Sequence, residues 1–397
     1  MEQAKIDPKD LETWAGFLLD HSLGGIKPED RVMIKGERIC WPLMAVLERR
    51  VIQAGAVPDV LLVPPNNERG KVWSATMGRC GSAAQIARVP EWHRLRYEGM
   101  TKYVEVTGAE DPREYGDLGS EQVGALAKAD RPFSATRVSK PWVLTLYPTP
   151  GFAAMEGLDL ETYTRFIVKA STTDPRPLKV AEERLRPCFA GARRITIETY
   201  HPRERRNLRL TMSIEERLVE LCYGSCNFPD GEIFTSPDAR TVEGEIYLDL
   251  PVHRAGHDVQ GITLKLEGGR ITRYSAEVGQ EQLAAVVETD QGSHRLGEVA
   301  LGMNPGLERV LKHPLFVEKV GGTLHIAIGD SYETSYVKDP SSAEGKAKLA
   351  EFDKAGVINR SAQHFDIVAD FRPGGCGRRV LLDDQVLRVE NGLWVGP

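Results

Sequence analysis

The chain has 397 residues, of which 41% are hydrophobic and 27% charged, a composition that suits a globular protein with a substantial core. The net charge of −6 and the pI near 5.9 exclude a broad basic surface for nucleic acid. The first ten residues are largely charged, and no stretch approaches the ~20 apolar residues that span a membrane, so we expect a cytoplasmic protein with neither a nucleic-acid nor a membrane partner.

The first half of the chain predicts alternating helices and strands. Residues 31–35, 41–54 and 57–63 form a predicted strand, helix and strand, which implies two parallel strands joined by a right-handed crossover. Further predicted elements are a helix at 9–22, a strand at 142–147 and a helix at 158–170. The GRCG segment at 78–81 lacks both GxGxxG and a Walker lysine, so it is interpreted as a turn and given no cofactor.

The second half is richer in short alternating segments that predict a sheet. Predicted strands lie at 194–199, 208–212, 244–250, 262–267, 270–277 and 296–302, and a helix at 280–289. A break in the pattern after residue 172 places the domain boundary near 185. The expected fold is α/β: an N-terminal α/β domain with parallel strands at 1–185, and a C-terminal mixed α+β, sheet-rich domain at 186–397.

Residues 323–329 are the most informative stretch. If they form a strand, Leu324, Ile326 and Ile328 point to one face and His325 to the other, beside only small neighbours. A core strand would normally fill that space, so the pattern indicates that His325 faces a metal or a substrate.

Acids and histidines elsewhere in this half fit the same interpretation. His364 and Asp366 are two apart, so on a strand they share a face and can converge on one ion. Glu298 lies in an otherwise small and apolar strand, where a carboxylate is costly unless a positive group meets it. Glu232 follows a turn and is a further candidate ligand. By contrast, a loop is the favoured interpretation for His253 and His257.

Four segments in this order, NFPDGEIFTSP, LGEVALG with NPG, LHIAIGDSY and HFD, resemble the thermophilic metalloaminopeptidase family of the aminopeptidase T and aminopeptidase S type. They lie between residues 227 and 366. The resemblance implies a C-terminal catalytic domain, a homodimer, a peptide substrate and two divalent metal ions (zinc, cobalt or manganese). Carried over by motif, the metal ligands are Glu232, Glu298, His325, Tyr332, His364 and Asp366, and Glu232 and Glu298 are also catalytic.

A charge count favours two ions over one. Glu232, Glu298 and Asp366 supply three negative charges, which two divalent ions balance to within one charge. The expected reaction is hydrolysis of the N-terminal peptide bond by a water that the two metals activate. The general base is open between Asp230 and Glu232, because this chain has Gly231-Glu232 where many family members have two consecutive glutamates.

Two other functions remain open at this point. His325, His364 and Asp366 alone would form the facial triad of a mononuclear non-haem iron enzyme, such as a ring-cleaving dihydroxypyridine dioxygenase. The second alternative is a metal-binding homologue without peptidase activity. The dioxygenase reading gives Glu298 and Tyr332 no role.

Overall fold

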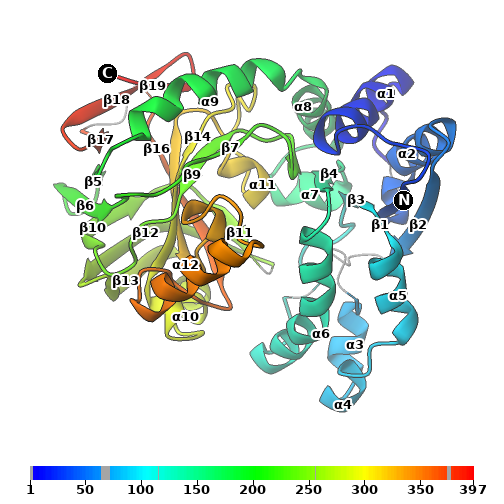
Figure 1. The fold of residues 1–397 in the computed structure, drawn as a ribbon, viewed down its shortest axis with the longest axis horizontal. Coiled ribbons are helices and arrows are strands. Elements are labelled where there is room, and N and C mark those ends of the chain that lie inside the picture. The colour runs from blue at the N-terminus through cyan, green and yellow to red at the C-terminus, as the bar shows by residue number, and fades with distance from the viewer. Residues whose placement is uncertain (1–2, 64–71, 115, 255, 373–376) are drawn as a thin grey trace. The chain divides into compact units, whose positions relative to one another are not determined.

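The computed structural model describes residues 3–63, 72–114, 116–254, 256–372 and 377–397. It divides into two compact units, which are treated one at a time. Unit 1 comprises Met1–Asp174 and Gly224–Pro229, and unit 2 comprises Pro175–Tyr223 and Asp230–Pro397 (Figure 1). Across the described residues, no helix has both the length and the apolar character that crossing a membrane requires.

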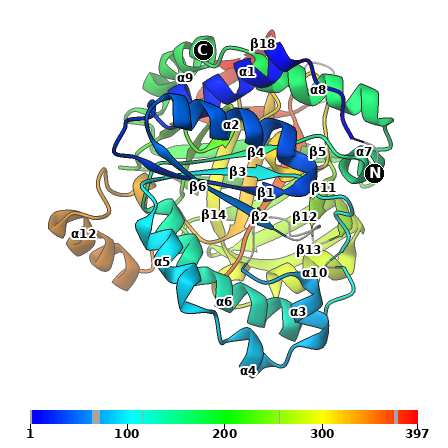
Figure 2. The ribbon, with the colours of Figure 1, turned by 90° about the vertical axis from the view of Figure 1, so that its right-hand side faces the viewer.

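Unit 1 is built on a five-stranded parallel sheet in the order β2-β1-β3-β4-β8. Its strands are β1 (Arg31–Glu37), β2 (Val57–Val63), β3 (Lys102–Thr107), β4 (Trp142–Leu146) and β8 (Asn227–Phe228). Helix α2 packs against β1 and β2, as the predicted crossover requires (Figure 2). The helices are α1 (Pro8–Gly16, continued by η1, Phe17–Ser22), α2 (Trp41–Gln53), α3 (Ala75–Cys80), α4 (Ala83–Ile86), α5 (Glu91–Gly99), α6 (Ser120–Val138), α7 (Pro150–Met155) and α8 (Leu160–Thr172).

Unit 2 contains two antiparallel sheets. The nine-stranded sheet has the order β11-β12-β10-β6-β5-β17-β18-β19, with β13 paired to β12, and the five-stranded sheet has the order β16-β15-β14-β9-β7. The strands of the larger sheet are β5 (Arg194–His201), β6 (Arg206–Ser213), β10 (Glu243–Leu248), β11 (Val252–Arg254), β12 (His257–Glu267), β13 (Arg270–Val278), β17 (Arg379–Leu382), β18 (Gln385–Glu390) and β19 (Leu393–Val395). Those of the smaller sheet are β7 (Glu220–Cys222), β9 (Glu232–Thr235), β14 (Leu296–Gly302), β15 (Thr323–Gly329) and β16 (His364–Asp370).

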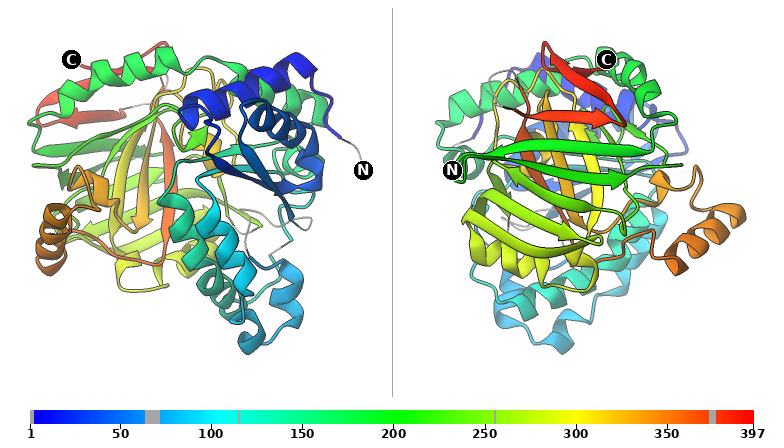
Figure 3. Two further views of the ribbon diagram at one scale, coloured as in Figure 1. Left: turned by 45° about the vertical axis from the view of Figure 1, so that its right-hand side comes forward. Right: turned by 90° about the vertical axis from the view of Figure 1, so that its left-hand side faces the viewer.

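The core of unit 2 fills the space between its two sheets. Leu324, Ile326 and Ile328 of β15 join one cluster with Leu210 and Leu264 of the larger sheet, and the right-hand view of Figure 3 shows the two sheets one behind the other. The helices of this unit are α9 (Arg176–Phe189), α10 (Gln280–Val287), α11 (Pro314–Val317) and α12 (Ala343–Lys354). Because one face of the smaller sheet is committed to this core, its other face is available for polar side chains.

The predicted fold class is confirmed: unit 1 has a parallel sheet with helices, and unit 2 is mixed and rich in sheet. The boundary expected between 185 and 186 falls inside α9, a helix that the sequence did not predict. Two local predictions were wrong. Gly78 and Cys80 lie in α3 rather than in a turn, and His253 and His257 lie on paired strands rather than in a loop, because β11 and β12 form a hairpin.

Candidate metal centre

The register of the smaller sheet places predicted ligands from three strands on the same face. Ala327 of β15 pairs with Asp366 of β16 on one side and with Glu298 of β14 on the other. His325 is two residues before Ala327, so it shares the same face. As predicted, this is the face opposite Leu324 and Ile326, and only the methyl group of Ala327 separates the two acids along the row.

Glu232 reaches the same face from the neighbouring strand. β9 pairs with β14 so that Phe234 lies opposite Ala300, which in turn lies opposite His325. Glu232 is two residues from Phe234 and therefore points the same way. Small residues at 300 and 327 leave room around the His325 ring.

His325 lies between two carboxylates. Its Nε2 is 3.0 Å from Oε1 of Glu298 and 3.3 Å from Oε2 of Glu232. All three residues are buried, with exposed fractions of 1% for His325, 3% for Glu298 and 6% for Glu232. Three donor atoms that attract cations therefore converge where water is excluded.

A second group of donor atoms forms where His364 approaches the other carboxylate oxygen of Glu298. Its Nε2 is 3.5 Å from Oε2 of Glu298 and 3.4 Å from Oδ1 of Asp366. Its Nδ1 is 3.0 Å from the backbone carbonyl of Asp330, so an N–H at this position donates to that oxygen. This arrangement orients the ring and directs Nε2 at the carboxylates, as in many histidine ligands of metals.

The sixth predicted ligand, Tyr332, borders the site. Its ring centroid is 5.0 Å from that of His364 and 5.0 Å from that of Phe234, and 45% of the residue is exposed. Burial of the hydroxyl raises the pKa of Tyr332 well above its ordinary value, and Glu298 and Asp366 raise this pKa further. The hydroxyl is therefore a neutral donor beside the carboxylates.

The donor atoms form two groups that share Glu298. We call Glu232, Glu298 and His325 the Glu232 subsite, and Glu298, His364 and Asp366 the Asp366 subsite; within each group the ligand atoms lie within 4.8 Å of one another. In the part of the chain that the structure describes, neither Oε2 of Glu232 nor Oδ1 of Asp366 has a hydrogen-bond partner. Buried, unsatisfied carboxylate oxygens are costly, and a metal ion at each subsite would satisfy them.

The electrostatics of the site indicate the same need for cations. Burial raises the pKa of Glu232, but Lys319 and His325 outweigh this effect and hold that pKa at about 2. Burial lowers the pKa of His364, whereas Asp366 and Glu298 raise it, to about 10. The carboxylates thus hold protons on the histidines, and a divalent ion can replace those protons with the same imidazole nitrogens as ligands. Oxygen and imidazole donors without a thiolate suit zinc, cobalt and manganese.

Two residues at this site were not among the predicted ligands. Lys319 is 2% exposed, and its Nζ contacts Glu232 and lies 3.1 Å from Oε1 of Glu318. Glu318 is itself buried, and its carboxylate groups with His325 and Asp366 within 4.8 Å, so it can serve as a further metal ligand. A sequence signal was available, since adjacent opposite charges lie between Val317 and Val320 in an apolar stretch.

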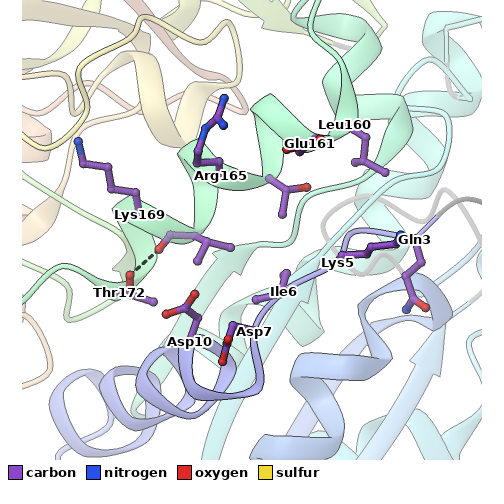
Figure 4. Close-up of a pocket in the computed structure, with 12 residues that line it drawn as sticks. Gln3, Lys5, Ile6, Asp7, Asp10, Leu160, Glu161, Arg165, Lys169 and Thr172 are labelled. Carbon is purple, nitrogen blue, oxygen red and sulfur yellow. Dashed lines mark hydrogen bonds between the residues drawn. The ribbon is translucent and has the colours of Figure 1, made fainter.

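Unit 1 contains a cavity of about 640 Å³ between the N-terminal segment and α8 (Figure 4). Lys5, Arg165 and Lys169 line it together with Asp7, Asp10 and Glu161, so positive and negative charges balance. The described residues that line it include no histidine or cysteine. The cavity therefore lacks the donor set that distinguishes the sheet of unit 2, and we assign it no part in metal chemistry.

Two known aminopeptidases resemble this chain, one along most of its length and the other along about a third of it. Aminopeptidase T of Thermus aquaticus is 30% identical over 325 residues, which cover 71% of this chain and 76% of that protein. Aminopeptidase 2 of Geobacillus stearothermophilus is 33% identical over 148 residues, which cover 36% of this chain and 33% of that protein.

Solved structures share the fold. AmpT from Thermus thermophilus superposes with a TM-score of 0.75 at 21% identity, covering 98% of this chain and 99% of that one. A 2,5-dihydroxypyridine dioxygenase from Pseudomonas putida KT2440 superposes with a TM-score of 0.57 at 13% identity, covering 99% of each chain. At these identities, both similarities concern the fold alone. The model of the thermophilic metalloprotease (M29) family, however, matches residues 7–372, and the chain therefore belongs to that family of metal-dependent peptidases, as its four motifs predicted.

Proposed function

We propose that the protein is an aminopeptidase that removes the N-terminal residue of peptides with the help of two divalent metal ions. The observation that carries the proposal is the position of Glu298. Its Oε1 faces His325 and its Oε2 faces His364, so one carboxylate can bridge two ions. Membership of a metalloprotease family and the aminopeptidases among the relatives support the same function.

The charges of the two subsites support two ions rather than one. Glu232 and Glu298 are buried and Asp366 is partly buried, so three negative charges lie close together, and Glu318 contributes a fourth carboxylate. Counted together with the positive charge of Lys319, the four ionised carboxylates carry −3, so a single divalent ion would leave the set negative after the histidine protons are displaced. We therefore keep the predicted ligand set of Glu232, Glu298, His325, Tyr332, His364 and Asp366.

Divalent ions, when bound, would supply a Lewis acid for the scissile carbonyl and activation of the attacking water. The residues of the chain do the remaining work. The Asp330 carbonyl holds the His364 ring in place, and Lys319 orients Glu232 through one carboxylate oxygen. Tyr332, kept in the ligand set, would hold an ion through its hydroxyl oxygen, beside the ring of His364.

Glu232 and Asp230 are the two candidates for the proton acceptor, and their carboxylates are oriented differently. Oε2 of Glu232 faces His325, on the same side as Glu298. Asp230, the other candidate, accepts the N–H of Gly231 at 2.9 Å and lies 3.7 Å from Nζ of Lys319. Because Oε1 of Glu232 is held by Lys319, Oε2 is the oxygen that this residue offers to an ion, so we propose Glu232 as a metal ligand and leave the proton acceptor open between Glu232 and Asp230.

The mononuclear iron alternative is less well supported by the geometry. Its triad requires His325, His364 and Asp366 around one ion. The three donor groups found among the described residues contain one histidine each. Because the imidazole rings of His325 and His364 belong to different donor groups, the arrangement on the sheet favours two ions over an iron triad.

The proposal is tested with a panel of aminoacyl amides and short peptides, assayed with added zinc, cobalt or manganese. We expect release of the N-terminal residue with at least one metal, and no release from the same peptides when their amino group is acetylated. Inactivity throughout, in protein that binds metal, would instead support the homologue without peptidase activity. Oxygen uptake with ferrous ion and a dihydroxypyridine would support the dioxygenase.

Two further expectations are kept as proposals. The homodimer implied by the family resemblance predicts twice the chain mass in light scattering, and the cytoplasmic location predicts activity in the cytoplasmic fraction of the source cells.

A further inference from the structure

Lys319 is a buried cation beside one of the two metal subsites. It follows α11 and precedes β15, and only 2% of its surface is exposed. Its Nζ contacts Glu232 and lies 3.1 Å from Glu318 and 3.7 Å from Asp230. Three acidic side chains therefore surround the single ammonium group of Lys319.

The contact with Lys319 divides the two oxygens of Glu232 between different partners. Oε1 is held by the ammonium, and Oε2 faces His325. Glu232 can therefore offer one oxygen to an ion, and part of its negative charge is already balanced. An ion at the Glu232 subsite would also lie near a fixed positive charge that repels it.

The Asp366 subsite has different electrostatics. Within the described ranges, the ion pairs of Glu298 and Asp366 involve histidines alone, with no lysine or arginine within 4.0 Å. His364 is oriented by a backbone carbonyl, and its Nε2 faces both carboxylates of this subsite. Both carboxylates of this subsite therefore remain available to an ion, and the charge of Lys319 reaches Asp366 only from beyond ion-pair distance.

We propose that Lys319 makes the two subsites unequal, so that the first divalent ion binds tightly at Glu298, His364 and Asp366 and the second binds weakly at Glu232, Glu298 and His325. This inference rests on the two-ion site of the proposed function. Lys319 acts here as a positioning residue: it fixes Glu232 as a one-oxygen ligand and sets the affinity of the second ion. The weak ion is then the one that exchanges with the surrounding metal pool.

The wild-type protein tests the inference without any substitution of Lys319. Chelator-treated protein is titrated with cobalt and followed by calorimetry and visible absorption. We expect two ions per chain with dissociation constants at least about tenfold apart. Asp366→Asn should abolish the tight ion, whereas Glu232→Gln should abolish the weak ion and keep the tight one. Two ions of equal affinity, or loss of the tight ion in Glu232→Gln, would overturn the inference.

Substitution of Lys319 tests whether this lysine causes the difference in affinity between the two subsites. Lys319→Met removes the charge at similar length, and we expect the weak ion to bind about tenfold or more tightly while the tight ion changes little. Lys319→Arg keeps the charge and should keep the inequality. Lys102→Met is the matched control, because Lys102 is also a buried lysine, paired with Asp30 at 3.1 Å in unit 1, and its loss should leave both constants unchanged.

The outcomes separate this inference from the proposed function. If circular dichroism shows a folded Lys319→Met protein with an unchanged weak constant, the inference fails. Hydrolysis of peptides by protein with two equal sites would overturn the inference alone. Two unequal ions without hydrolysis would overturn the aminopeptidase and leave the inference standing. A single ion in both the wild type and Lys319→Met would overturn both.

Discussion

Nε2 of His325 lies 3.0 Å from Oε1 of Glu298, although 27 residues separate them in the sequence. The contact follows from antiparallel pairing of β14 with β15, which places both side chains on the face turned away from the core. A buried carboxylate that meets an imidazole in this way is explained by a cation. The predictions below test that explanation.

Glu298→Gln is expected to weaken the binding of both ions, because this side chain belongs to both subsites. We expect peptide hydrolysis to fall by about 100-fold or more at limiting metal. Elemental analysis after dialysis against trace zinc measures the metal loss. Glu220→Gln, on β7 of the same sheet and outside both subsites, is the control and should retain metal and activity. Retention of both ions by Glu298→Gln would contradict the bridging role.

Ala327→Val tests whether small side chains create room for the ions. Ala327 lies between Glu298 and Asp366 in the sheet, so two added methyl groups would enter the space between their carboxylates. We expect metal binding to be lost and the free energy of unfolding to fall by about 1 to 3 kcal/mol.

Ala369→Val is the matched control for this substitution, because Ala369 is also buried but belongs to the core on the opposite face of the sheet. It should lower stability by a similar amount and leave metal content unchanged. Equal metal content in the two variants would show that space beside Ala327 does not matter.

Removal of metal with a chelator is expected to lower the thermal midpoint. Without ions, the buried Glu232 and Glu298 and the partly buried Asp366 remain close together, whereas bound ions stabilise only the folded state. At a free ion concentration one hundred times the dissociation constant, the gain is about 2.7 kcal/mol. Differential scanning calorimetry with and without added zinc measures it, and identical midpoints would argue that this cluster binds no ion.

Asp290→Asn is expected to destabilise the loop before His364 in a pH-dependent way. Asp290 accepts the N–H of Ala362 at 2.7 Å and that of Ser293 at 2.8 Å. Burial raises its pKa, but these N–H groups outweigh burial and lower the pKa below 3.8. Because the folded-state pKa is depressed, the stability that Asp290 contributes is present above 3.8 and is lost as the pH falls through the folded-state value.

Urea unfolding of wild type and Asp290→Asn measures this effect. We expect a difference of about 1 to 3 kcal/mol at pH 7, typical of hydrogen bonds to a charged group, and a smaller difference near pH 3. A difference that stays constant between these pH values would show that the charge of Asp290 is not responsible.

The sequence predicted local elements well where apolar residues alternate. The ranges 296–302 and 323–329 were predicted without error as β14 and β15, and His325 points as expected. Strand β3 was missed because it carries charges. Glu105 is buried there, where it accepts a hydrogen bond from Tyr103 at 2.7 Å and pairs with Arg137 at 3.4 Å.

The candidate site was predicted only in part, for a related reason. Motif resemblance supplied the ligand set, but the row of Asp366, Ala327 and Glu298 depends on pairing between distant strands, which no local pattern encodes. Lys319 was missed because a lysine next to a glutamate ordinarily lies at the surface. It is buried here because three acids surround it, and those acids meet only in the folded chain.

The proposed function depends on two divalent ions at the smaller sheet of unit 2. The most direct test is to equilibrate chelator-treated protein with zinc in small excess, remove free ion, and count metal per chain by elemental analysis at a concentration above the weaker dissociation constant. We expect two ions per chain. One ion, or none, would contradict it.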